Sequence, residues 1–193
     1  MKINYDNKEY GLAYIETESG SGSGLMITST GVCLTCNHVI EDCKEIFVRL
    51  ENRQSRIVYK ADIVYYDKDN DYAILQLLDC NDNNFYEIET DYHNIKTGDD
   101  VAIYGFPFGS DLNEDVMELE PSLTKGYIAS KNKINGKDCY YLDIRSAPGN
   151  SGGPVFSLKT KKVIGYLCGS YGSDRSNMIY IRTLEVFLNE IVE

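Results

Sequence analysis

The stretch with the clearest chemical potential is a glycine-rich turn, Gly149-Asn150-Ser151-Gly152-Gly153-Pro154. Glycine permits backbone angles and close approaches that a Cβ forbids, so glycines on both sides of Ser151 predict a sharp turn. Such a turn can point the backbone N–H groups of Gly149 and Ser151 into one concavity, where a developing oxyanion can be held. The stretch therefore predicts a serine nucleophile. A glycine-rich hairpin with an incidental serine is the alternative.

This turn resembles the nucleophile loop of trypsin-like serine proteases, which have the chymotrypsin fold. It is most similar to the loop of bacterial members, such as the high-temperature-requirement proteases, which carry Asn rather than Asp before the serine. The resemblance implies an oxyanion hole built from Gly149, Asn150 and Ser151.

A candidate general base lies upstream, in Thr35-Cys36-Asn37-His38-Val39, which begins at the last of the strand-like residues 31–35. The chain has only two histidines, and this segment resembles the one that carries the catalytic histidine in the same family. The other, His93, lies in a polar context and is expected to be exposed. A hydrogen-bonded structural histidine is the alternative for His38.

The third candidate is Asp71, which directly precedes an apolar strand and so can turn its carboxylate inward. Asp67 and Asp69, in the same turn, are expected to be solvated. Asp71-Tyr72-Ala73-Ile74-Leu75 resembles the family segment that holds the triad aspartate. The order His38, Asp71, Ser151 implies that Ser151 attacks the carbonyl, His38 transfers the proton and Asp71 orients the imidazole.

A zinc site competes for part of this stretch, because Cys33, Cys36, His38 and Cys43 are all possible zinc ligands. If residues 31–36 form a strand, however, Cys33 and Cys36 point to opposite faces and cannot share one ion. We therefore expect no metal and no cofactor.

The composition predicts an all-β chain: of 193 residues 16 are glycine, and short runs rich in Val, Ile and Tyr alternate with turn residues. The resemblance covers residues 11–192 and implies two six-stranded antiparallel Greek-key barrels with a C-terminal α-helix after Thr183. We expect the first barrel, with His38 and Asp71, in residues 1–90. The second, with Ser151, is expected in residues 91–193.

Charge and hydropathy restrict the partners and the location. With 30 acidic and 19 basic residues the net charge is −11, which repels phosphate backbones and disfavours a nucleic-acid partner. No apolar run is long enough to cross a bilayer, so we expect no membrane association. Residues 1–10 lack the apolar core of a signal peptide, which predicts a cytoplasmic location and six reduced cysteines.

The resemblance also implies a substrate cleft. Arg145, six residues before Ser151, would lie at the base of the specificity pocket and favour an acidic substrate side chain. The alternatives are that Arg145 turns outward and pairs with Asp143, and that small or apolar side chains are preferred. Met178 would narrow the pocket. Cys168-Gly169-Ser170 would pair with the substrate backbone, and Cys168 stands where many members have a serine that supports the triad aspartate.

The function predicted from these residues is that of a serine endopeptidase acting on protein or peptide substrates. A catalytically silent peptide-binding module of the same fold is the alternative. Because no regulatory domain is evident in the sequence, we also expect a regulatory protein partner.

Overall fold

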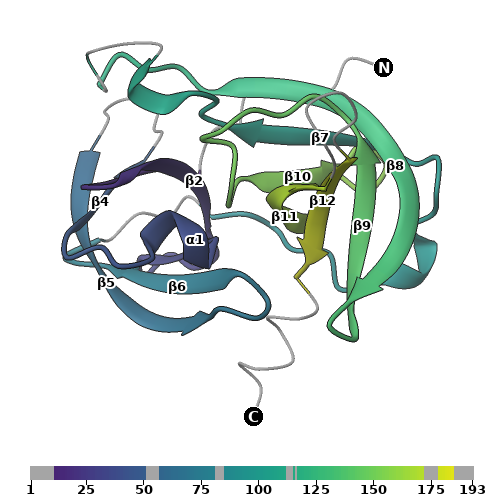
Figure 1. The fold of residues 1–193 in the computed structure, drawn as a ribbon, viewed down its shortest axis with the longest axis horizontal. Coiled ribbons are helices and arrows are strands. Elements are labelled where there is room, and N and C mark those ends of the chain that lie inside the picture. Colours follow the sequence, from purple (N-terminus) through teal and green to yellow (C-terminus); the bar gives the residue numbers. More distant parts are fainter. Residues whose placement is uncertain are drawn as a thin grey trace.

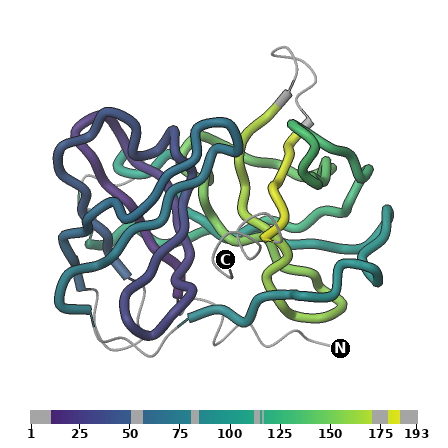
Figure 2. Tube along the Cα trace, turned by 90° about the horizontal axis from the view of Figure 1, so that it is seen from below, coloured from purple at the N-terminus to yellow at the C-terminus, as the bar shows by residue number. Residues whose placement is uncertain are grey.

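The computed structural model describes residues 11–50, 57–80, 85–111, 115, 117–171 and 178–184 of the chain. These residues form two closed barrels, each of six antiparallel strands. In Figure 1 the first barrel lies on the left and the second on the right, and Figure 2 shows the two halves of the sequence side by side from below. The predicted all-β, chymotrypsin-like fold of two six-stranded barrels is confirmed.

The first barrel closes in the strand order β1-β2-β3-β6-β5-β4. Its strands are β1 (Leu12–Thr17), β2 (Gly20–Met26), β3 (Val32–Thr35), β4 (Ile46–Leu50), β5 (Ile57–Asp67) and β6 (Tyr72–Leu77), with the short helix α1 (Asn37–Ile40) after β3. Inward-facing side chains such as Ile15, Met26 and Leu75 are fully buried in its core. Burial of one such side chain stabilises the fold by about 1.5–3 kcal/mol.

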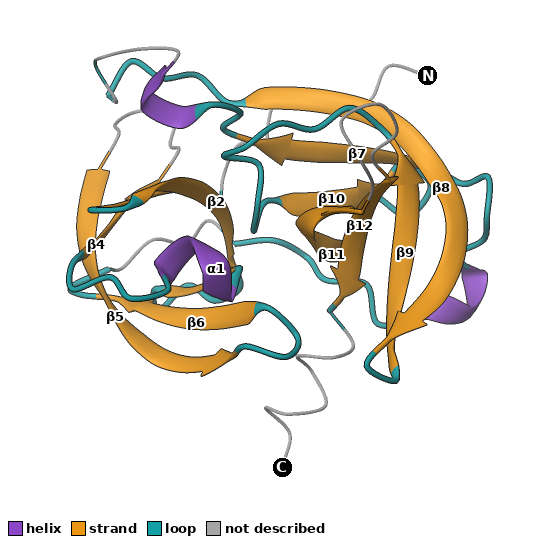
Figure 3. Ribbon diagram, viewed as in Figure 1, coloured by secondary structure: helices purple, strands orange, loops and turns teal. Residues whose placement is uncertain are grey.

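The second barrel closes in the order β10-β11-β12-β9-β8-β7. Its strands are β7 (Asp100–Gly105), β8 (Ser122–Ile134), β9 (Lys137–Asp143), β10 (Pro154–Ser157), β11 (Val163–Tyr171) and β12 (Met178–Thr183). Two 3₁₀ turns, η1 (Tyr92–Asn94) and η2 (Gly109–Asp111), flank β7. Strands dominate both barrels, as Figure 3 shows.

A separate cluster of buried side chains is drawn from both barrels and joins them. Tyr14 of β1 packs edge-on against Phe106, which follows β7, with ring centroids 5.3 Å apart. Tyr166 of β11 belongs to the same cluster and is fully buried. This inter-barrel packing fixes the relative position of the two halves that carry the candidate catalytic residues.

The structure differs from the sequence prediction in one strand. Because turn-forming and polar residues separate them, residues 56–59 and 63–66 read in the sequence as two separate strands, but β5 runs unbroken from Ile57 to Asp67. The polar residues between them, Lys60 and Asp62, are exposed on either side of a buried Ala61, which is ordinary strand alternation. The expected C-terminal helix lies outside the described residues.

Candidate active site

His38 is presented by the single helical turn that follows β3. The Thr35 hydroxyl donates to the backbone oxygen of Ser23 at 2.7 Å, which holds the end of β3 against β2. Cys36 then keeps extended backbone angles and α1 begins at Asn37. Of the His38 side chain, 46% is exposed, so the ring is anchored at its backbone and open toward solvent.

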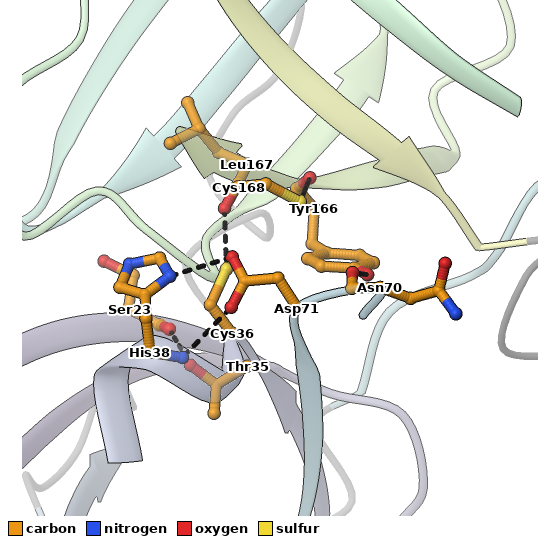
Figure 4. Close-up of polar contacts among 9 residues, drawn as sticks. All are labelled: Ser23, Thr35, Cys36, His38, Asn70, Asp71, Tyr166, Leu167 and Cys168. Atoms are coloured by element: carbon orange, nitrogen blue, oxygen red, sulfur yellow. Dashed lines mark hydrogen bonds and ion pairs between the residues drawn. The ribbon is translucent and has the colours of Figure 1, made fainter. Parts of the chain in front are cut away.

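Asp71 holds His38 through both of its carboxylate oxygens. His38 Nδ1 lies 2.8 Å from Asp71 Oδ2, and the His38 backbone N–H donates to Asp71 Oδ1 at 3.0 Å. Figure 4 shows both bonds. The hydrogen bond to Asp71, with the charges of Asp71 and Glu41, raises the pKa of His38, although partial burial opposes the shift. The ring is therefore fixed in the tautomer that leaves Nε2 as proton acceptor.

Ser151 lies in a turn whose glycines are required by close packing. Gly149 and Gly152 have φ values of +93° and +84°, which favour glycine. A Cβ on Gly149 would collide with the Phe106 backbone oxygen, and one on Gly152 with that of Ser23. Ser151 and His38 line the same cavity, of about 210 Å³, and no hydrogen bond joins them within the described residues.

Two backbone N–H groups of this turn point to no acceptor in the described residues: those of Gly149 and Ser151. Asn150 N–H donates instead to Ala147 O at 3.1 Å, so it differs from the other two candidates for the oxyanion hole. The Pro148 carbonyl accepts a bond from Phe108 N–H at 2.6 Å. Because C=O and N–H point in opposite directions across a trans peptide, Gly149 N–H faces away from Phe108. Gly149 and Ser151 both line the His38 cavity.

Ser23, which the sequence pattern alone does not single out, fixes this turn. Its hydroxyl donates to Gly149 O at 2.7 Å and accepts from Phe106 N–H at 3.0 Å, while its own N–H donates to Ser151 O at 2.8 Å. Ser23 is fully buried. The run Gly20-Ser21-Gly22-Ser23-Gly24 has the composition of a linker, and the only signal for Ser23 was that a strand follows at once.

A second cavity, of about 680 Å³, is also lined by Ser151. Its walls combine apolar side chains, Ile144, Leu167 and Ile179, with the polar side chains of Arg145, Ser146 and Ser170 and with Gly169. The Arg145 side chain is exposed and makes no ion pair among the described residues. Asp143, its alternative partner, accepts a 2.5 Å hydrogen bond from the Tyr127 hydroxyl.

Cys168, Met178 and His93 lie on different elements: β11, β12 and η1. Cys168 is only 2% exposed, and its thiol donates to Tyr166 O at 3.7 Å within the inter-barrel cluster. Met178 begins β12, and its side chain lies outside the described residues. His93 is exposed, in η1.

The four cysteine and histidine positions proposed for zinc do not converge. Cys33 packs inside the first barrel, whereas Cys36 belongs to the inter-barrel cluster. The only described group with possible metal-ligand atoms close together is Cys36, His38 and Asp71, within 4.8 Å of one another. The Cys36 thiol donates to Leu167 O at 3.1 Å, and burial, the Cys168 thiol and the Asp71 charge raise its pKa. Cys36 therefore keeps its proton, and the cluster is explained without an ion.

Comparison with known families places the chain among proteases. The model of the trypsin-like peptidase domain matches residues 22–165. A "probable periplasmic serine endoprotease DegP-like" from Pseudomonas putida is 35% identical over 147 residues, which cover 74% of this chain and 28% of that relative. A protein of the same name from Halomonas elongata is also 35% identical over 147 residues. The chain thus spans 28% of the length of these curated relatives.

Solved structures share the fold. The HtrA-type protease AlgW with a tripeptide superimposes with a TM-score of 0.81 at 23% identity, over 97% of this chain and 61% of that one. Deg5 superimposes with a TM-score of 0.77 at 23% identity, over 96% of this chain and 88% of that one. At this level of identity the similarity supports the fold alone.

The predicted cytoplasmic location is wrong, because the curated relatives are named periplasmic endoproteases. The prediction depended on the polarity of residues 1–10, which lie outside the described residues. Among the described residues, no helix is both long and apolar enough to span a bilayer. All six cysteines are free thiols in the structure.

Proposed function

Since the chain belongs to the trypsin-like peptidase domain family, we propose that it is a serine endopeptidase whose triad is Ser151, His38 and Asp71. The observation that carries the proposal is the pairing of His38 with Asp71 at 2.8 Å on the wall of the cavity that also contains Ser151. The names of the curated relatives, serine endoproteases, point to the same reaction.

Each triad residue has one role. Ser151 Oγ attacks the carbonyl carbon of the scissile peptide while His38 Nε2 takes up its proton. Asp71 holds the imidazole in the required tautomer and stabilises the imidazolium, as the raised pKa of His38 indicates. His38 then protonates the leaving amine, and an ester of Ser151 remains. Water activated by His38 hydrolyses that acyl-enzyme and restores the serine.

The oxyanion of the tetrahedral intermediate is held by the backbone N–H groups of Gly149 and Ser151. Both lack an acceptor within the described residues and line the cavity beside His38. Donors that are already oriented are more effective than water, because they need not reorganise as the charge develops. Asn150 supports the hole through the turn bond to Ala147 and donates nothing to the oxyanion.

The larger cavity beside Ser151 is the pocket for the substrate side chain that precedes the scissile bond. Arg145 lines it without an ion-pair partner among the described residues, and Asp143 is already bonded to Tyr127. A guanidinium binds a carboxylate bidentately, so we assign this pocket a preference for acidic side chains. Residues 168–170 of β11, including Gly169 and Ser170 at the cavity, pair with the backbone of a protein or peptide substrate.

Hydrolysis of casein by the protein and by two variants tests the proposal. Ser151→Ala should lower turnover by about a thousandfold or more, because the nucleophile is lost. Ser130→Ala, on β8 and outside both cavities, should hydrolyse casein as the unaltered chain does. Equal activity of Ser151→Ala and Ser130→Ala would refute the serine mechanism. If the unaltered chain binds casein but does not hydrolyse it, the silent peptide-binding module is indicated instead.

A further inference from the structure

The turn that presents Asp71 places this residue in a left-handed backbone conformation. Asp71 has a φ of +55°, a left-handed conformation that non-glycine residues adopt at a cost. Asp67, expected to be solvated, holds one side of the turn: its carboxylate accepts from Asn70 N–H at 3.0 Å and from Asn70 Nδ2 at 2.6 Å. The position of Asp71 therefore depends on the contacts of the residues just before it.

The second barrel holds the other side of the turn. The Tyr166 hydroxyl, from the middle of β11, donates to the backbone oxygen of Asn70 at 3.2 Å. Tyr166 is fully buried, and Asn70 is 8% exposed. At the surface, Asn135 Nδ2 donates to the backbone oxygen of Asp69 at 2.9 Å from the hairpin between β8 and β9. Figure 4 shows Tyr166 beside Asn70 and on the far side of Asp71 from His38.

The carboxylate of Asp71 receives no bond from the second barrel in the described residues. Both of its bonds come from His38. Cys168, two residues beyond Tyr166, directs its thiol to the Tyr166 backbone oxygen, and Cys36 directs its thiol to Leu167 O. Among the described residues, the hydrogen bond that β11 makes with the turn before Asp71 is therefore the one from the Tyr166 hydroxyl to the Asn70 carbonyl.

We propose that Tyr166 is a positioning residue for catalysis, assisted at the surface by Asn135: from the second barrel, its hydroxyl fixes the turn that presents Asp71 to His38 in the first. This proposal rests on the proposed protease function. Without the hydroxyl, the buried Asn70 carbonyl loses its donor, and the turn can relax toward a less strained conformation. The Asp71–His38 bond then weakens, although both catalytic side chains are intact.

Tyr166→Phe tests the proposal, and Tyr92→Phe is its matched control. Tyr92 also donates its hydroxyl to a β11 carbonyl, Ile164 O at 3.1 Å, but within the second barrel and away from Asp71. We expect Tyr166→Phe to lower kcat for a peptide substrate about tenfold with KM changed less than about twofold, because only the proton-transfer step is affected. Tyr92→Phe should leave both constants unchanged.

The pKa of His38 supplies a readout that is independent of turnover. The chain has two histidines, so NMR titration resolves His38, with exposed His93 as internal reference. Because the bond to Asp71 is the main cause that raises the pKa of His38, Tyr166→Phe should lower that pKa relative to the unaltered chain. Asn135→Gly keeps the left-handed hairpin residue and removes the surface bond, so it should produce a smaller change in the same direction.

The positioning role is contradicted if Tyr166→Phe keeps the kcat and the His38 pKa of the unaltered chain, or if Tyr92→Phe changes them equally. If Tyr166→Phe does not fold, an unchanged His38 pKa in Asn135→Gly contradicts the proposal. Failure of the protease function is distinct: the unaltered chain would then show no hydrolysis, while the titration of His38 would still report whether Tyr166 positions Asp71.

Discussion

The region where the two barrels meet and the cavity that opens beside it are built on different principles. At the barrel junction, groups from both halves are joined: Ser23 bonds to Gly149 and Ser151, and Tyr166 to Asn70. In the adjoining cavity, the Arg145 side chain is exposed and has no ion-pair partner in the described part of the chain. We infer that the fold dictates the reaction geometry, whereas single exposed side chains dictate substrate preference. Substitutions at the barrel junction should reduce turnover with every substrate. Substitutions in the cavity should change which substrates are preferred.

The largest effect in this comparison is expected from Asp71→Asn, which keeps the shape of the side chain and removes its charge. An amide permits the wrong imidazole tautomer and does not stabilise the imidazolium, so kcat should fall by about 10⁴-fold. Asp62→Asn, an exposed position on β5, should have no effect on kcat. Steady-state kinetics provide the measurement. A fall in kcat of less than tenfold for Asp71→Asn would show that the His38–Asp71 pair is not required for turnover.

Ser23→Ala should have the next largest effect. It removes both hydroxyl bonds and leaves Gly149 O and Phe106 N–H without a side-chain partner, so the oxyanion donors lose their fixed orientation. We expect kcat to fall about 10- to 100-fold with KM nearly unchanged, and the free energy of unfolding to fall by about 2 kcal/mol. Ser29→Ala, in the turn after β2, is the control. If Ser23→Ala lowers the free energy of unfolding but keeps the kcat of the unaltered chain, Ser23 does not orient the donors of the oxyanion hole.

Arg145→Ala should change substrate preference rather than general activity. Peptides with Glu or Asp before the scissile bond should lose about tenfold in kcat/KM relative to peptides with Ala or Leu there, since the cation that binds the carboxylate is gone. Arg145→Lys should keep part of the preference. Peptide-library profiling makes the measurement. Strong cleavage after Lys or Arg by the unaltered chain, or a preference for apolar residues that Arg145→Ala does not alter, would exclude the assigned role.

A smaller effect is expected on the pH dependence. Protonated His38 cannot accept the Ser151 proton, so kcat/KM falls as the pH drops through the His38 pKa, which the structure places above its ordinary value. Glu41 contributes to that rise, so Glu41→Gln should lower the pKa and retain activity to lower pH. Glu45→Gln breaks a comparable ion pair, with Lys60 instead of Lys68, and should leave the profile in place. Coincident shifts in both variants would mean that general surface charge governs the profile.

The two regions also differ in how far the sequence predicts them. The two-barrel fold was implied by the resemblance of short segments to trypsin-like proteases. His38, Asp71 and Ser151 stand out within those segments, because glycine spacing, an apolar strand and one polar residue at its end are local properties. Ser23 was missed because its hydroxyl partners are 83 and 126 residues away, so only the folded chain brings them together. The Tyr166–Asn70 bond spans 96 residues. Asp67 was expected to be solvated, since a run of acidic residues does not reveal which one caps the turn.

The cellular location was predicted from residues 1–10 and was wrong, for a different reason. Composition near one end of a chain is not a property of the fold. The prediction of six reduced cysteines was drawn from that location, and all six are free thiols in the structure. The environment of the Cys36 thiol, by contrast, follows from packing between the barrels and could be established only from the structure.

The most direct test of the account is whether Ser151 is an activated nucleophile. A fluorophosphonate probe modifies serine only where a base removes its proton and an oxyanion hole receives the charge, so it reports the assembled site without any assumption about substrate. Mass spectrometry of the labelled protein should find one adduct per chain, on Ser151, abolished in Ser151→Ala and strongly slowed in Asp71→Asn. The absence of an adduct in the unaltered chain, or equal labelling of Ser151→Ala, would contradict the account.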